Sequence, residues 1–177
     1  MKNILLLLFT TSVVFFSGCG DTKKVETVSI PGMKQVSIAI AGDSLTLFVP
    51  DPEIEKKPLV IEQKPSGATE ITVGPNFQIS IEEGSGDIAL LKSDIAGDDV
   101  YKLQKFVKDE PKLLFWEVKI LDMDGTKCHF YNIIEAGKSS YTIRDIETGE
   151  SFSQISIQRM VDAAQTLKAK EAAAPDA

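Results

Sequence analysis

Two adjacent residues, Cys128 and His129, have the side-chain types of a nucleophile and its general base. They lie in a run that predicts a β-strand, where adjacent side chains point to opposite faces of the sheet. Cys128 and His129 therefore cannot hydrogen-bond each other, and with a single His in the chain no other Cys/His or Ser/His/Asp set is expected. We predict a buried, structural Cys128 and a strand His129 near the sheet edge, with no catalytic role for either.

A second candidate site is the acidic run Asp122-Met123-Asp124-Gly125, which resembles the start of a calcium-binding loop. In such a loop the glycine comes sixth and a bidentate Glu twelfth. Here the glycine comes too early and that Glu is missing. Asp-Gly is also a strong signal for a type I′ hairpin turn, so we predict a turn and no calcium site. One His and scattered carboxylates predict no metal site, no acid/base pair and no cofactor.

Gly84-Ser85-Gly86-Asp87 precedes a helical pattern, as a phosphate-binding loop does. The Lys-Ser/Thr that completes such a loop is missing, and the Asp87 carboxylate would repel a phosphate at a helix N-terminus. An aspartate directly before a helix is a favoured N-cap. We therefore predict that Asp87 caps a helix.

The N-terminus combines Lys2, an apolar run from Ile4 to Phe16 and the sequence Phe16-Ser17-Gly18-Cys19. A basic start, a short apolar segment and small residues before a cleavage point are typical of a secretory signal peptide. The run is shorter than the roughly 20 residues that span a bilayer. Its end resembles the lipobox of bacterial lipoprotein precursors, with Phe16 where Leu is usual. That resemblance implies cleavage before Cys19 and acylation of the Cys19 sulfur by a diacylglycerol.

This interpretation makes residues 1–18 a signal peptide and residues 19–34 a lipidated, mostly polar tether. More than one acyl chain is needed for stable anchoring, and a diacylated cysteine provides this. The predicted membrane contact is therefore the lipid on Cys19. Gly20 follows the cysteine, which in lipoproteins weakly favours the outer membrane. We expect a protein anchored by lipid to a membrane of a bacterial cell envelope.

The mature chain is acidic and poor in cysteine. Removing residues 1–18 takes away Lys2 and no acidic residue, so the formal net charge changes from −7 to −8. Without a cluster of Lys and Arg, the chain lacks the features of a nucleic-acid-binding protein. Once Cys19 is acylated, Cys128 has no partner for an intrachain disulfide, and the core alone must hold the fold.

Alternating apolar residues from Val36 to Val49 predict an N-terminal β-hairpin. A two-residue loop at Gly42-Asp43 gives a type II′ turn. It pairs Ile40 with Leu45, Ile38 with Leu47, and Val36 with Val49. All six side chains then share one face. That face is either part of the core, which we expect, or an exposed site for a partner.

The rest of the chain completes one predicted domain at 35–168, and a disordered tail follows at 169–177. A Pro-rich connection at 50–67, with an edge strand at Leu59–Glu62, leads into a main unit at 68–168.

We expect the strands of the main unit at 71–73, 77–82, 113–123, 126–134 and 140–146. We expect one helix from Asp87, recapped at Asp98 and continuing to Pro111, and a second beginning at Ser153 or Ser156. The Asp124-Gly125 turn would set Trp116 opposite Ile133.

Strands in hairpins with separate helices predict an α+β fold, an antiparallel sheet covered by two or three helices. This order, together with the segments Ser44–Pro50 and Ser156–Lys168, resembles the PsbP-like class. That class includes membrane-associated, non-enzymatic assembly factors and bacterial lipoproteins. The resemblance implies a binding or assembly role, although a fold alone does not determine function.

We therefore expect a non-enzymatic, lipid-anchored binding or assembly module of the cell envelope with a protein partner. Two alternatives stay open. An immunity-type lipoprotein would neutralise a toxin, and the acidic charge would suit a basic partner. An envelope hydrolase would need two converging carboxylates with a raised pKa.

Overall fold

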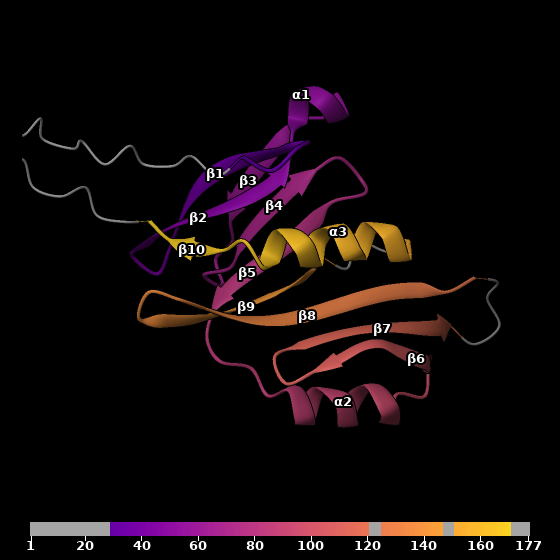
Figure 1. Cartoon of the computed structure of the whole chain (residues 1–177). Coiled ribbons are helices and arrows are strands. Elements are labelled where there is room, and N and C mark those ends of the chain that lie inside the picture. Colours follow the sequence, from indigo (N-terminus) through magenta and orange to yellow (C-terminus); the bar gives the residue numbers. More distant parts are fainter. Residues whose placement is uncertain (1–28, 121–124, 147–150, 171–177) are drawn as a thin grey trace, which may run out of the picture.

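The computed structural model describes residues 29–120, 125–146 and 151–170 (Figure 1). The strands are β1 (Met33–Ile40), β2 (Asp43–Pro50), β3 (Leu59–Gln63), β4 (Thr69–Val73), β5 (Gln78–Glu83), β6 (Tyr101–Glu110), β7 (Leu113–Ile120), β8 (Lys127–Ala136), β9 (Ser139–Asp145) and β10 (Lys168–Ala169). The helices are α1 (Pro52–Glu55), α2 (Ile88–Gly97) and α3 (Gln154–Ala164).

The strands of the described residues form two antiparallel sheets. One has three strands in the order β1-β2-β10, and the other has seven in the order β3-β4-β5-β9-β8-β7-β6. The predicted class, an α+β fold with an antiparallel sheet, helices and an N-terminal hairpin, is confirmed. Strand β10 places Ala169, the first residue of the expected tail, beside Leu45 in the smaller sheet.

The N-terminal hairpin forms, but its turn lies one residue earlier than predicted. The loop is Ala41-Gly42, and both residues have positive φ (50° and 93°), as a type I′ turn requires. Asp43 belongs to β2, where its carboxylate accepts hydrogen bonds from Tyr141 and Ser139. The six apolar side chains still share one buried face, because the register has shifted by an even number of residues.

The hairpin face is part of the core and is not a partner site. Helix α3 packs against β2, β8 and β9, and it lies between the two sheets (Figure 1). The core cluster contains Leu45 and Leu47 from the hairpin, Phe115 and Phe130 from the main sheet, and Met160 from α3. Each of these five side chains is at most 1% exposed.

The Pro-rich connection contains α1 and the edge strand β3, which confirms the strand predicted at Leu59–Glu62. The final helix is also confirmed, with Ser153 as its N-cap. A two-residue turn at Gly137-Lys138 joins β8 to β9, since Ala136 pairs with Ser139.

The helix predicted to continue from Asp98 to Pro111 is wrong, because this segment is the edge strand β6. Its pairing with β7 shifts register between Leu103 and Lys105 and between Phe106 and Lys108. Each shift marks an extra residue in β6, as in a β-bulge. The two bulges space Leu103, Phe106 and Val107 like the apolar positions of a helix, which explains the error.

The register predicted for β7 and β8 is also wrong. Trp116 pairs with His129, not with Ile133, and Val118 pairs with Lys127. The shift of four residues is even, so each side chain keeps its predicted face. The β7–β8 connection is consequently longer than a two-residue Asp124-Gly125 turn. Residues 121–124 of this connection lie outside the described part of the chain.

Helix α2 lies on the opposite side of strands β6–β8 from α3 (Figure 1). Only Ile95 among its ten residues is buried. In the described part of the chain, no helix has the length and apolar character needed to cross a bilayer.

Candidate functional site

The two faces of β7 and β8 carry different side chains. Phe115, Cys128 and Phe130 point into the core. Trp116 and His129 lie on the other face, where their ring centroids are 5.6 Å apart and the rings are tilted by 32°. Side-chain alternation along β8 therefore separates Cys128 from His129, as the sequence predicted. Strand β8 is an interior strand of the seven, so the prediction that His129 lies near the sheet edge is wrong.

Cys128 has the environment of an unreactive thiol. It is 4% exposed, and burial, with a further contribution from the Glu117 carboxylate, raises the pKa of the Cys128 thiol. The thiolate, which is the nucleophilic form, is therefore disfavoured.

His129 pairs with a carboxylate that the sequence analysis did not identify. Its Nδ1 lies 2.7 Å from Asp145 Oδ2, and the backbone N–H of Phe130 donates to Asp145 Oδ1 at 2.8 Å. In the backbone ladder, Asp145 of β9 pairs with Ile79 of β5. The backbone ladder between β8 and β9 ends one residue earlier, at Tyr131 and Arg144. Beyond that end, the Asp145 side chain links β9 to β8. The Asp145 side chain is only 4% exposed, against 14% for His129.

The sequence contains only part of the information for this pair. The β8–β9 register, in which Ala136 pairs with Ser139, places Asp145 beside Phe130 when it is carried along the strands. Strict alternation would put the Asp145 side chain on the face of Phe130, so its contact with His129 does not follow from the register alone. The single His does have an Asp partner, Asp145, on a neighbouring strand.

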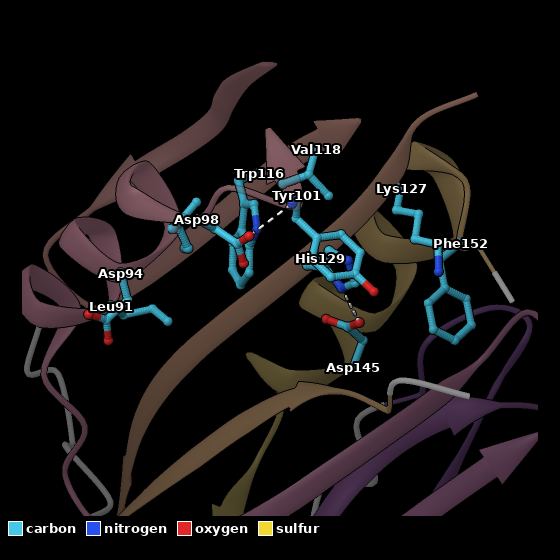
Figure 2. A pocket seen from close by; sticks show the side chains of 11 residues that line it. Leu91, Asp94, Asp98, Tyr101, Trp116, Val118, Lys127, His129, Asp145 and Phe152 are labelled. Atoms are coloured by element: carbon cyan, nitrogen blue, oxygen red, sulfur yellow. Dashed lines mark hydrogen bonds and ion pairs between the residues drawn. The ribbon is translucent and has the colours of Figure 1, made fainter. Parts of the chain in front are cut away.

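A pocket of about 440 Å³ lies between α2 and the face of the sheet that carries Trp116 and His129. Figure 2 shows Leu91, Asp94 and Asp98 on one side of this space and Lys127 and Phe152 on the other. Trp116, Tyr101 and His129 lie between them. The full lining is Leu91, Asp94, Ile95, Asp98, Tyr101, Trp116, Val118, Lys127, His129, Asp145 and Phe152. We call this space the α2 pocket.

A second hollow of about 320 Å³ continues from the α2 pocket along the same face. The two share Leu91, Trp116, His129 and Asp145. The second hollow adds polar side chains from β4, β5, β8 and β9, namely Glu70, Ser80, Tyr131 and Arg144. The Trp116–His129–Asp145 group thus stands where the two hollows meet.

Hydrogen bonds at both ends of α2 position the helix over the pocket. Asp87 caps its N-terminus by accepting the Leu90 N–H at 2.9 Å, which confirms the predicted cap. At its C-terminus, Asp98 Oδ1 accepts the N–H groups of Val100 and Tyr101 at 2.7 and 2.9 Å. These bonds turn the chain from the helix into β6 and place Asp98 and Tyr101 on the pocket wall.

The loop before α2 packs closely on Tyr131. A Cβ atom at Gly86 would lie 1.9 Å from the Tyr131 Oη. A side chain at this position would therefore displace either the tyrosine ring or the start of the helix, so Gly86 fixes how closely α2 approaches the sheet.

Several predicted site residues lie outside the described part of the chain. Cys19 with its lipobox belongs to residues 1–28, and Asp122 to Asp124 belong to the undescribed part of the β7–β8 connection. Among the described residues, no three His, Cys, Asp or Glu side chains converge as metal ligands do.

Comparison of the chain with protein-family models, with curated proteins and with solved structures found no match. The resemblance to bacterial lipoprotein precursors and to the PsbP-like class therefore stays a prediction from the sequence.

Proposed function

We propose that this chain is a lipid-anchored binding protein of a bacterial cell envelope, and that the α2 pocket is its ligand site. The observation that carries the binding role is the pocket itself, which has aromatic walls and a few convergent polar groups. Small-molecule sites are typically concave, largely apolar and some 300–1,000 Å³ in volume. At about 440 Å³, the α2 pocket lies within this range.

His129 supplies a directional polar group in this site. Asp145 orients the ring through Nδ1, and within the described residues Nε2 forms no hydrogen bond. With the Nδ1 proton donated to Asp145, Nε2 is a hydrogen-bond acceptor for a ligand. A buried carboxylate that fixes a histidine tautomer is a common way to prepare such a group.

The anchor is supported by the sequence Phe16-Ser17-Gly18-Cys19. Replacing Cys19 with Ser should abolish labelling by a fatty-acid analogue and move the protein from the detergent phase to the aqueous phase. A Cys19→Ser protein that stays in the detergent phase would exclude lipid anchoring at this residue.

The ligand site is tested by filling the pocket from the helix side. Leu91 lines the pocket, whereas its neighbour Leu90 is 60% exposed and does not line it. Native mass spectrometry of the mature domain, incubated with small molecules extracted from the cell envelope, should show a bound species with the wild type. Leu91→Trp should lose that species and Leu90→Trp should keep it. Equal binding by both variants would place the ligand elsewhere.

One observation favours a second candidate, an envelope hydrolase. The His129–Asp145 pair has the geometry of a general base and its orienting carboxylate. In a hydrolase, Nε2 would accept a proton from an attacking water. His129→Gln keeps a polar side chain but removes the base, so it should abolish turnover of a captured ligand if hydrolysis occurs. In a binding protein, the captured ligand would be recovered unchanged from the wild type.

A further inference from the structure

The α2 pocket has an excess of negative charge. Three carboxylates, Asp94, Asp98 and Asp145, face one ammonium group, Lys127, across the pocket lining. With His129 neutral, the lining carries a formal charge of −2, and with His129 protonated it still carries −1. An anionic ligand would meet net repulsion here, and a cationic ligand would meet net attraction.

The three carboxylates differ in how far the protein already satisfies them. Asp145 accepts from His129 and from the Phe130 backbone. Asp98 uses Oδ1 for two backbone N–H groups. Asp94, which is exposed, forms no hydrogen bond or ion pair within the described residues. It therefore keeps its full capacity for a ligand, and Asp98 keeps its second oxygen.

The aromatic part of the lining also favours a cation. The Nζ of Lys127 lies 6.0 Å from the centroid of the Tyr101 ring, so a cation of the protein already occupies this ring face and a ligand cation would use another. Trp116 offers a second face and gives the strongest cation–π attraction of the aromatic side chains. Carboxylates beside an indole ring are thus arranged for a positive group attached to an apolar body.

We propose that the α2 pocket binds a small organic ammonium ion that has an aromatic or apolar body. The body lies among Leu91, Ile95 and Trp116, and the ammonium group faces Asp94 and Asp98. This inference deepens the proposed function and depends on the α2 pocket being a ligand site.

Trp116 is the only tryptophan of the chain, so its fluorescence reports directly on the pocket. Three probes of similar size differ in charge: phenethylammonium (+1), 2-phenylethanol (0) and phenylacetate (−1). Titration of the mature domain should give the lowest Kd for phenethylammonium, roughly tenfold below that of 2-phenylethanol. Phenylacetate should bind most weakly. Added salt should raise the Kd of phenethylammonium and leave that of 2-phenylethanol unchanged.

Matched variants locate the charge that is recognised. Asp94→Asn should raise the Kd of phenethylammonium by roughly two- to fivefold without changing that of 2-phenylethanol. Asp162→Asn removes an exposed carboxylate from α3, on the other side of the sheet, and should change neither.

The outcomes separate the two proposals. If phenylacetate or 2-phenylethanol binds as tightly as phenethylammonium, or if Asp94→Asn behaves like Asp162→Asn, the ammonium class is wrong and the site stands. If no probe changes the Trp116 fluorescence and Leu91→Trp also leaves capture of the envelope ligand intact, the site itself is wrong.

Discussion

The two faces of the seven-stranded sheet are packed differently. On one face, Phe115 and Phe130 are at most 1% exposed under α3 and the hairpin. On the other face, α2 buries a single residue, Ile95, and leaves the α2 pocket against Trp116 and His129. Close packing contributes stability, whereas incomplete packing leaves room for a ligand. Stability and binding should therefore respond to different substitutions.

The largest effect is expected on the core face. Leu47 of the hairpin is fully buried in the core cluster, so Leu47→Ala should lower the free energy of unfolding by about 2–5 kcal/mol. The loss includes the transfer of the side chain and the cavity it leaves. Urea denaturation followed by circular dichroism measures it. Leu90→Ala, on exposed surface of α2, is the control and should change stability by less than about 0.5 kcal/mol. Similar losses for both variants would remove the distinction between the faces.

Gly86→Ala should have the next largest effect, at the contact between α2 and the sheet. The new Cβ would overlap the Tyr131 phenol, and overpacking of this kind costs about 1–3 kcal/mol. Because the strain acts on the α2 side of the sheet, it should also shift the fluorescence maximum of Trp116. Combining Gly86→Ala with Tyr131→Phe removes the closest contact and should restore part of the stability. No recovery in the double variant would show that the strain has another source.

The sequence predicted the core face better than the pocket face. Val36, Ile38 and Ile40 alternate with polar or small residues, and this period of two holds even when a turn moves by one residue. The opposite face depends on the β-bulges of β6, which interrupt the two-residue period of a regular strand. The bulges of β6 gave Leu103 and Phe106 a helical spacing, and the resulting helix prediction concealed the edge strand that supports Tyr101.

The candidate site was harder to predict for a related reason. His129, Trp116 and Asp145 come from three strands, and their meeting depends on cross-strand register. The β8–β9 register could be read from a tight turn at Gly137-Lys138. The β7–β8 register could not, because the Asp124-Gly125 signal lies within a longer connection. Asp94 and Tyr101 reach the pocket only because α2 folds back over the sheet, which no local pattern shows.

Tyr141→Phe should have a moderate effect that depends on pH. The Tyr141 hydroxyl donates to Asp43 Oδ2 at 2.6 Å and links β9 to the hairpin. Burial, together with the hydrogen bond to Asp43, raises the pKa of Tyr141 from 10.0 to about 12. A raised pKa favours the protonated phenol in the folded state, so this contribution to stability is complete below pH 10 and is lost as the pH rises towards 12.

At neutral pH, Tyr141→Phe should cost about 1–2 kcal/mol, because one hydrogen bond to a charged group is lost. Above pH 10 the difference between the variant and the wild type should shrink. Denaturation curves at pH 7 and at pH 11 measure both effects, and a difference independent of pH would contradict the link between Tyr141 ionisation and folding. Ligand binding should stay unchanged, because Tyr141 belongs to the core face.

The smallest effect on global stability, and the sharpest test of the comparison, concerns how α2 is held. Lys92 of α2 pairs with Asp109 of β6 at 2.6 Å, and the two side chains are 37% and 46% exposed. Exposed pairs contribute about 0.2–1 kcal/mol, so Lys92→Gln should barely change global unfolding. It should nevertheless speed hydrogen exchange of the α2 amides, since few buried contacts resist a local opening of this helix. The α3 amides should not respond, because they are expected to exchange only through global unfolding.

Lys112→Gln, which removes another exposed pair with Glu135, is the control and should leave α2 exchange as in the wild type. If α2 and α3 exchange with the same free energy in the wild type, α2 is as firmly packed as the core, and the contrast between the two faces disappears.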